Sequence, residues 1–494
     1  MKLDALKKKF LALKPFLKPF LILFLIYIVA MLAVFRAGVS FTDDQRRAIA
    51  GGAWLRDFNR HSSTALALLM NVNDRLLDIS PWPQILGLAF LSIAGVILTY
   101  VFCDKKIRYL PLVLTAFIGL LPLTTECWLY KFDAPFMALS LLVSVLPILW
   151  WPKKIEKKAL RKFGIVALIC MLIMWTTYQA SSGVFPVLCV FLALKDYFNG
   201  EKVSLILKKL LFAVGVFVVA ALIFRFGLPA PTESYRETKM FGIMGLIPGV
   251  LGNFGEYLKM MAESLNIYQM ILVGLAMVGT TILVFLKYKL KGFLILVAFL
   301  VALPLSIGAY LLLEEPSLMA RALIGIGASF VPVLILATKD LRKFGEYVLV
   351  APSLVLLYSF AVFVLALGNG LADQERWANY RVEDLASRLS ELYPSESDVA
   401  DRAVIIYGDI GYSAVLKHVA NKFPATRKIM TAQQTGLSGA VWGLKKITDY
   451  YNRDMGFSGD ANSGYCGPEV SEVRADTYYY KIRENSEFIC VDLK

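Results

Sequence analysis

Apolar residues in this 494-residue chain occur in long blocks that are separated by short basic clusters. The blocks are roughly 15 to 21 residues long, which is close to the length that an α-helix needs to cross the hydrocarbon core of a bilayer. The pattern predicts a mainly α polytopic membrane protein with about eleven transmembrane helices. We place them at residues 16–35, 84–103, 109–123, 134–151, 163–178, 184–197, 210–228, 268–286, 293–313, 323–337 and 347–367.

The connections between these spans alternate in charge. The strongly basic connections lie at residues 105–108, 153–162, 195–209, 287–291 and 339–343. Cationic loops remain in the cytoplasm, so these connections and the basic N-terminus belong there. No small-residue cleavage site follows the first span, and we expect this span to be retained. An odd number of spans then places the C-terminal region on the side of the membrane opposite the cytoplasm.

The chain changes character after the last span, where charged residues replace long apolar blocks. We predict a transmembrane domain over residues 1–367 and a periplasmic C-terminal domain over residues 368–494. Within the transmembrane domain, the two long periplasmic loops are residues 36–83 and residues 229–267.

Each of these long loops has a pattern of its own. Residues 45–55 and 64–77 of the first loop carry apolar residues at helical spacing with charges between them. This spacing is typical of helices that lie along a membrane surface. Residues 241–265 of the second loop are apolar but contain glycines and a proline, which predicts an interfacial or re-entrant, mobile segment.

The C-terminal domain reads as a small α/β domain. A charged helical pattern at residues 373–392 precedes an apolar strand at 403–407, and a final strand is expected at 488–493. Gly408 and Gly411 separate the first strand from a predicted helix. Cys466 and Cys490 both lie in this domain, and an oxidising compartment would allow them to form a structural disulfide, with two free thiols as the alternative.

The composition agrees with a membrane protein, since 57% of the residues are hydrophobic and 18% are charged. The net charge of +14 does not require a nucleic-acid partner, because many of the cations lie in short loops where the positive-inside rule explains them. No cysteine spacing resembles a zinc site.

Two adjacent carboxylates, Asp43 and Asp44, follow the first span at the expected outer surface of the membrane. One interpretation is structural, because acidic residues favour a helix N-terminus and Thr42 or Asp43 would suit its cap. The other is chemical, because such a carboxylate could accept a proton from a hydroxyl group or bind a divalent metal. Arg47 lies at helical spacing from both carboxylates and could orient them or meet a phosphate.

The other outer connections add polar side chains that could line one cavity with this pair. Arg321 stands just before a span, where an arginine either contacts a lipid phosphate or extends toward the headgroups. Besides Arg47, the candidates for contacting a phosphate or another part of a ligand are Arg60, Glu126, Lys131, Asp133, Gln179, Arg236 and Arg321.

Several segments of the membrane part carry a family likeness. They are Val39–Arg47, Gly51, Gly52, Asn59, Arg60, Leu68–Asn71, Asp78–Pro81, Pro83–Leu86 and Phe132–Ser140. These segments resemble those of the serotype-converting O-antigen glucosyltransferases of the Gtr type II family. The resemblance implies the membrane-embedded glycosyltransferase fold called type C, in which acidic residues of the first outer loop are essential for transfer. Asp43 and Asp44 match those positions.

The resemblance also implies the substrates, namely undecaprenyl-phosphate glucose as donor and lipid-linked O-antigen as acceptor, joined on the periplasmic side. We expect a direct displacement that inverts the anomeric carbon, in which Asp43 or Asp44 activates the acceptor hydroxyl and cations stabilise the leaving phosphate. Asp43 is slightly favoured because it comes first after the span. No cofactor is certain, and a divalent metal stays open.

Two other classes of protein would share this location. A flippase or transporter of lipid-linked sugars would need outward charges and many helices, but the sequence shows no internal repeat and few charges within the spans. Another O-antigen assembly factor, such as a polymerase, is the second alternative.

Overall fold

The computed structural model describes residues 2–44, 47–48, 51–52, 59–228, 239–394, 402–430 and 470–494. The chain divides into two compact units. The first comprises Met1–Leu32 and Gly51–Leu365, and the second comprises Ala33–Ala50 and Ala366–Lys494.

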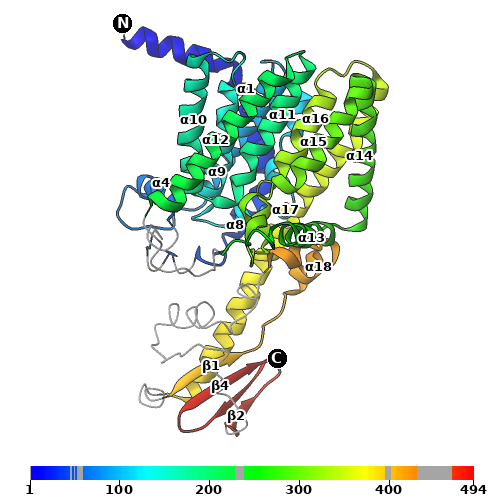
Figure 1. Ribbon diagram of the computed structural model, residues 1–494. Helices are drawn as coiled ribbons and strands as arrows, with labels where there is room; N and C mark the ends of the chain where they lie inside the picture. Colours follow the sequence, from blue (N-terminus) through cyan, green and yellow to red (C-terminus); the bar gives the residue numbers. More distant parts are fainter. Residues whose placement is uncertain are drawn as a thin grey trace. The chain divides into compact units, whose positions relative to one another are not determined.

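The first unit is built from helices of very different lengths (Figure 1). Its α-helices are α1 (Lys2–Ala37, whose last residues belong to the second unit), α4 (His61–Asn71), α5 (Trp82–Phe102), α6 (Tyr109–Leu114), α7 (Phe117–Leu120), α8 (Thr125–Leu129), α9 (Ala134–Val145), α10 (Lys157–Trp175), α11 (Val184–Phe198), α12 (Val203–Gly227), α13 (Leu246–Glu263), α14 (Ile267–Tyr288), α15 (Gly292–Leu305), α16 (Gly327–Thr338) and the first part of α17 (Phe344–Leu392). Five 3-10 helices occur among them, namely η1 (Leu146–Trp150), η2 (Gln179–Gly183), η3 (Lys289–Lys291), η4 (Gly308–Leu312) and η5 (Ala320–Leu323).

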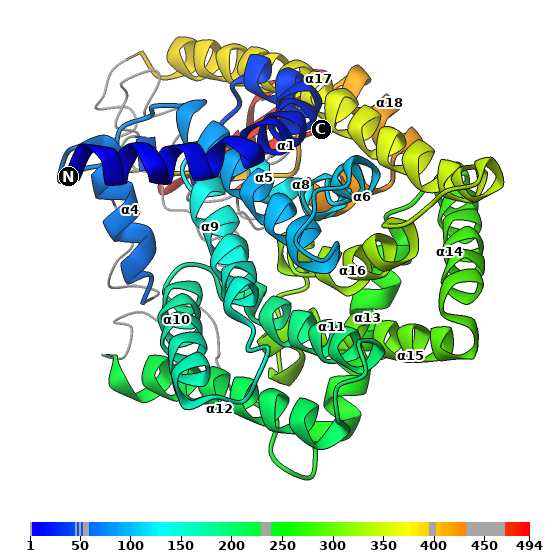
Figure 2. The same ribbon diagram turned by 90° about the horizontal axis from the view of Figure 1, so that it is seen from above.

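Neighbouring helices in this unit bury apolar and small residues. Helices α10, α11 and α12 share a core in which the Phe163 and Phe185 rings lie 6.3 Å apart and the Trp175 and Phe217 rings lie 5.9 Å apart. Seen from above, α5 and α9 lie side by side, as do α10 and α12 (Figure 2). At Gly279 of α14, a Cβ atom would lie 2.2 Å from the carbonyl oxygen of Leu349, so only glycine permits this approach to α17.

Several helices also leave large apolar side chains uncovered. Leu211 and Phe226 of α12 are 70% and 78% exposed, and Leu300 of α15 is 64% exposed. Contiguous apolar surface of this kind is rare on soluble monomers and is normal on helices that face lipid. The protein is therefore a membrane protein, as its sequence predicts.

Within the described residues, seven helical segments are long and apolar enough to cross a membrane. They are Lys14–Ala37, Trp82–Phe102, Gln179–Phe198, Val203–Gly227, Ile267–Leu305, Ala320–Thr338 and Phe344–Leu392. Two further apolar helical stretches, Tyr109–Leu120 and Ala134–Trp150, are shorter. The predicted spans at 268–286 and 293–313 fall mostly on one segment, which η3 divides. The predicted span at 163–178 overlaps α10, which begins with a basic turn and is not among the seven. The total of eleven stays a prediction.

The two long loops contain helices whose ends differ from the expected ones. The first loop has α4, which ends at Asn71 instead of continuing to Leu77, because Val72 adopts a left-handed conformation and the Asn71 side chain accepts the N–H of Leu77 at 2.9 Å. The other predicted helix of that loop, at 45–55, lies largely outside the described residues.

The second loop has α13, an 18-residue helix in spite of its glycines. Pro248 falls in the first turn, where a helix tolerates proline. The Asn253 amide donates to the carbonyl oxygen of Leu313 at 2.8 Å, and the Tyr257 hydroxyl donates to that of Ser317 at 3.0 Å. Leu246–Glu263 of this apolar segment thus form a helix with side-chain hydrogen bonds to residues that follow η4, while its mobility and its depth in the membrane stay predictions.

The second unit combines the end of α1, the second part of α17 and a four-stranded sheet. The strands are β1 (Ala403–Tyr407), β2 (Glu472–Asp476), β3 (Tyr480–Glu484) and β4 (Phe488–Leu493), in the order β1-β4-β3-β2. β1 pairs with β4 in parallel, and the other pairs are antiparallel. Two short helices, α18 (Ala414–Lys422) and α19 (Ala425–Ile429), follow β1. The predicted strands at 403–407 and 488–493 coincide with β1 and β4.

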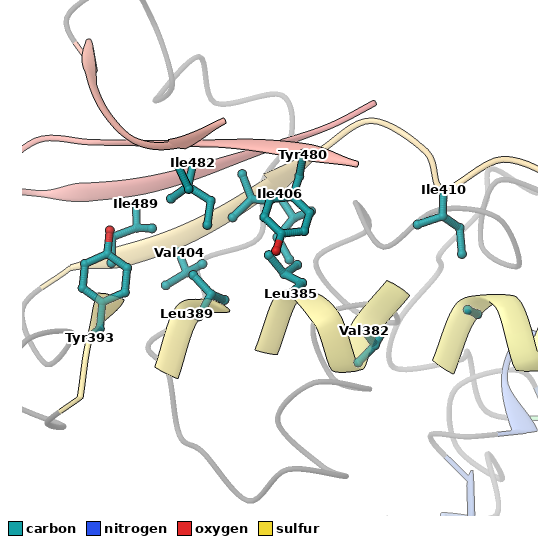
Figure 3. Packing of buried hydrophobic residues seen from close by; sticks show 13 residues of the cluster. Val382, Leu385, Leu389, Tyr393, Val404, Ile406, Ile410, Tyr480, Ile482 and Ile489 are labelled. Carbon is teal, nitrogen blue, oxygen red and sulfur yellow. The ribbon is translucent and has the colours of Figure 1, made fainter. Parts of the chain in front are cut away.

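The core of this unit lies between α17 and one face of the sheet (Figure 3). Val382, Leu385 and Leu389 repeat at helical spacing along α17, and Val404 and Ile482 come from β1 and β3. All five are almost completely buried. The charged helical pattern predicted for 373–392 is therefore one amphipathic part of a longer, uninterrupted helix.

Candidate functional site

The acidic pair of the first loop lies in a tight turn of the second unit. Gly38 and Thr42 have positive φ values of 59° and 43°, which reverse the chain soon after α1 ends. The Asp44 side chain is buried, and its Oδ2 accepts the backbone N–H of Phe41 at 2.9 Å. The backbone N–H of Arg47 donates to the Asp43 carbonyl oxygen at 3.1 Å, so a helical turn starts here.

This turn leaves from a part of α1 that is fixed against α17 within the same unit. A Cβ atom at Gly368 would lie 2.5 Å from the backbone nitrogen of Val34, so only glycine permits the close packing. The Arg36 guanidinium donates a hydrogen bond to the Asn369 side chain. The backbone before Asp43 and Asp44 is thereby held in place by two neighbouring residues of α17.

The two carboxylates differ in environment. Asp44 is 1% exposed and holds the turn, whereas Asp43 is only partly buried. The N–H groups that a capping Asp43 carboxylate would accept belong to residues 45 and 46, which lie outside the described residues, so the capping interpretation stays a prediction. Among the described residues, no three His, Cys, Asp or Glu side chains are grouped as metal ligands, and metal dependence stays open.

A second cluster, in the first unit, joins Glu126 of α8 to Arg321 of η5. Glu126 Oε1 accepts a hydrogen bond from the Arg321 guanidinium at 2.7 Å, and Oε2 accepts the backbone N–H of Arg321 at 2.8 Å. The same guanidinium donates to the Tyr130 hydroxyl and lies 5.4 Å from the centre of that ring. The Tyr178 hydroxyl donates to the Arg321 carbonyl oxygen at 3.3 Å.

The electrostatics of this cluster favour a fixed cation. Burial raises the pKa of the Glu126 carboxyl, while the charge and hydrogen bonds of Arg321 oppose that shift. Glu126 is 1% exposed, whereas the Arg321 side chain keeps 19% of its surface exposed. Glu126 thus holds Arg321 through both the backbone and the side chain of that arginine, whose side chain is not fully buried. A partly buried arginine that a carboxylate holds at two points differs from one that simply extends toward the headgroups.

The structure brings another predicted residue to this cluster. The Arg60 guanidinium lies 5.8 Å from the centre of the Tyr178 ring, so Arg60, Tyr178 and Arg321 are consecutive neighbours. Tyr130 was missed by the sequence reasoning, although its position four residues after Glu126 is the spacing that places two side chains on one helical face.

The remaining predicted residues have separate partners. Lys131 pairs with Asp78 at 3.1 Å, and although burial would raise the pKa of Asp78, hydrogen bonds from Ser80 and the interaction with Lys131 lower it. Asp133 is buried immediately before α9, and Gln179 donates to the Trp175 carbonyl oxygen at 3.0 Å.

Two predicted residues, Arg236 and Cys466, lie outside the described residues. Cys490 is buried in β4, and its disulfide with Cys466 stays a prediction.

Comparison with known proteins identifies the family. A family model described as glucosyl transferase GtrII matches residues 32–332. The chain belongs to the GtrII glucosyl transferase family. The match confirms the resemblance seen in the sequence and supports a glucosyl transferase activity for this membrane protein. No curated protein and no solved structure matches the chain.

The GtrII match contains most of the candidate chemistry. It begins within α1 and ends within α16, so it includes the acidic pair, Arg60, Glu126 and Arg321. It does not extend to α17 or to the sheet of the second unit. The GtrII match therefore covers the chain from the end of α1 to α16, including both long loops, while α17 and the C-terminal sheet lie beyond it.

Proposed function

We propose that this GtrII-family enzyme transfers glucose from undecaprenyl-phosphate glucose to lipid-linked O-antigen on the periplasmic side of the bacterial inner membrane. The match to the glucosyl transferase model across residues 32–332 is the observation that carries the proposal. A membrane-embedded enzyme suits a donor whose polyprenyl tail stays in the bilayer. The alternation of basic connections supports a cytoplasmic N-terminus and a periplasmic C-terminal domain.

The proposed reaction is a single displacement with inversion. The acceptor hydroxyl oxygen attacks the anomeric carbon of glucose, its proton passes to a carboxylate, and the bond between that carbon and the phosphate oxygen breaks. Undecaprenyl phosphate leaves with the bonding electrons. Asp43 is the better candidate for the base because it is partly exposed, whereas the buried Asp44 carboxylate is engaged in shaping the turn.

Arg321 is the proposed contact for the departing phosphate. A guanidinium presents several N–H donors in a plane and pairs well with phosphate oxygens. Glu126 accepts one hydrogen bond from this guanidinium and one from the Arg321 backbone N–H, and so would orient the group before any substrate arrives. Arg47 and Arg60 are further candidates for phosphate contacts, and Lys131, Asp133, Gln179 and Arg236 for other parts of the substrates.

A transfer assay tests the proposal. Purified full-length protein in detergent is given undecaprenyl-phosphate glucose labelled in the sugar, together with lipid-linked O-antigen, and label in the acceptor is measured. We expect transfer without any nucleotide sugar. No transfer, or transfer that requires a nucleoside-diphosphate sugar directly, would contradict the proposed donor. A flippase would move the lipid without forming a glycosidic product, and a polymerase would lengthen the acceptor without adding labelled glucose.

A further inference from the structure

Four aromatic side chains gather around one arginine in the second unit. Trp377, Tyr380 and Arg381 lie on α17, and Tyr478 and Tyr479 form the turn between β2 and β3. We call these five residues the aromatic platform. The α17 members are three and four residues apart, which places them on one helical face.

The rings of the aromatic platform contact one another in a continuous series. Trp377 and Tyr380 are stacked with their centres 5.9 Å apart, and Tyr479 meets each of them edge-on at 5.9 Å. Tyr478 meets Tyr479 edge-on at 5.1 Å. The Arg381 guanidinium lies 4.5 Å from the centre of the Tyr479 ring and 5.3 Å from that of Trp377.

The platform is rigid on its inner side. Trp377 and Tyr479 are partly buried against the apolar core of this unit. The Trp377 indole N–H donates to the Ile410 carbonyl oxygen at 2.9 Å, and Arg381 donates to the Tyr479 carbonyl oxygen at 2.8 Å. The Thr477 hydroxyl accepts the backbone N–H of Tyr480 at 3.1 Å, which fixes the turn.

The outer side of the aromatic platform is exposed. Tyr478 is 86% exposed and Tyr380 is 48% exposed. Exposed, pre-ordered aromatic rings lose little conformational entropy when a ligand covers them, so they suit a binding surface. Arg381 itself is 3% exposed, so the platform presents phenol rings and their hydroxyl groups while its own guanidinium stays covered.

We propose that the aromatic platform binds the neutral polysaccharide of the acceptor, with sugar rings stacked on Tyr478 and Tyr380. This inference rests on the proposed glucosyl transfer to a polysaccharide. The faces of aromatic rings are electron-rich, and the C–H groups on one face of a pyranose carry partial positive charge, so the two attract each other. Phenol hydroxyl groups at the edges can exchange hydrogen bonds with sugar hydroxyls.

Two observations favour a glycan as the occupant. The guanidinium of Arg381 is covered by the rings, so the five platform residues themselves expose ring faces and hydroxyl groups and no charge, although the exposed side chains of Arg376 and Lys494 lie beside them. The platform also lies beyond the segment that matches the family, on a different part of the chain from the proposed phosphate contact at Arg321. A surface that recognises the acceptor needs no contact with the donor.

The test uses full-length protein and the O-polysaccharide released by mild acid from the lipopolysaccharide of the strain that carries the gene. Binding is measured by calorimetry, and transfer kinetics are measured with the lipid-linked acceptor. Tyr478→Ala and Tyr380→Ala should each weaken polysaccharide binding and raise the acceptor KM by about three- to tenfold, the usual size of one lost aromatic contact. The donor KM and kcat should not change. Tyr478→Phe keeps the ring and should retain at least half of the wild-type affinity.

Val473→Ala is the matched control, because Val473 is an exposed apolar residue of β2 near the other end of the same hairpin. It should leave both KM values unchanged. Unchanged polysaccharide binding in both tyrosine-to-alanine variants overturns the inference, even if the wild-type enzyme transfers glucose. Loss of transfer only when the acceptor is embedded in vesicles, with normal binding of free polysaccharide, would assign the platform to the membrane surface instead. Absence of any transfer by the wild-type enzyme would count against the proposed function. Calorimetry with the free polysaccharide would still show whether the aromatic platform binds it.

Discussion

Replacing Glu126 by glutamine should separate the orienting role of this residue from the role of Arg321. Glutamine keeps the size and one acceptor oxygen but removes the charge that balances the buried guanidinium. Breaking a buried ion pair by removing one partner typically costs about 3–5 kcal/mol. Since the Arg321 side chain is 19% exposed, water screens part of this loss, and we expect about 2–3 kcal/mol of destabilisation.

The effect on catalysis should be of similar size. A misplaced guanidinium would lose a charge-assisted hydrogen bond to the donor phosphate, worth about 1.5–3 kcal/mol, or roughly 10- to 150-fold in kcat/KM for the donor. The assays are the unfolding half-life of the protein in detergent at a fixed temperature and the kinetics of transfer from undecaprenyl-phosphate glucose.

A double variant, Glu126→Leu with Arg321→Met, provides the decisive comparison. Removing both charges at once should restore much of the stability, because no uncompensated buried charge remains. Transfer should stay lost, because the phosphate contact is gone. If the double variant regained both stability and transfer, the pair would be purely structural. Wild-type stability and kinetics in Glu126→Gln would refute the reasoning from the start.

Three further outcomes are expected. Asp43→Asn should lower the rate of transfer by about a hundredfold to ten-thousandfold with normal membrane insertion, as expected for a general base, and Asp44→Asn should also lower it by loosening the turn. Asp74→Asn replaces an exposed aspartate of the same outer loop and should transfer at the wild-type rate. Equal rates of transfer in all three variants would exclude a catalytic role for the acidic pair. A reporter that is active only in the periplasm, fused after Lys494, should be active, and activity of a cytoplasm-only reporter there would reverse the proposed topology. The pKa of Asp78 is lowered in the folded protein, so its pair with Lys131 should stabilise the fold at pH values above the unfolded pKa of about 3.9. This stabilisation should be lost as the pH falls through the lower folded pKa, and the difference in thermal stability between wild type and Asp78→Asn should therefore shrink in acid. A difference that grew in acid would contradict the assignment.

The elements that could be predicted are those in which local sequence and tertiary environment agree. β1 is an edge strand and β4 lies between β1 and β3, but both are almost entirely apolar and contribute buried residues to the core, so short runs of branched residues identified them. β2 and β3 were missed because charged residues interrupt their apolar positions, as in Glu472–Asp476, which forms an edge of the sheet. The α4 helix was drawn too long because the side chain of Asn71 ends it, and apolar spacing alone carries no sign of that bond.

Only part of the candidate site could be predicted from the sequence, for a different reason. The acidic pair stands out locally, since two adjacent carboxylates follow an apolar span. The Glu126–Arg321 pair joins residues 195 positions apart, and each looked like an isolated charge at the end of a span. A single sequence contains no signal that links such distant partners, so the pairing, and with it the orienting role of Glu126, required the fold.

The clustering of residues 33–50 with residues 366–494 has a practical consequence for exchanging C-terminal regions between related enzymes. A chimaera joined only at residue 366 would keep Val34 and Arg36 of this enzyme but would take the residues that replace Gly368 and Asn369 from the related enzyme. A bulkier side chain opposite Val34 would then displace the backbone that leads to Asp43, and the hybrid would lose transfer even if its new acceptor-binding region were intact. Hybrids with altered acceptor range should therefore be cut at two places, with the stretch from Ala33 to Ala50 moved together with the C-terminal region.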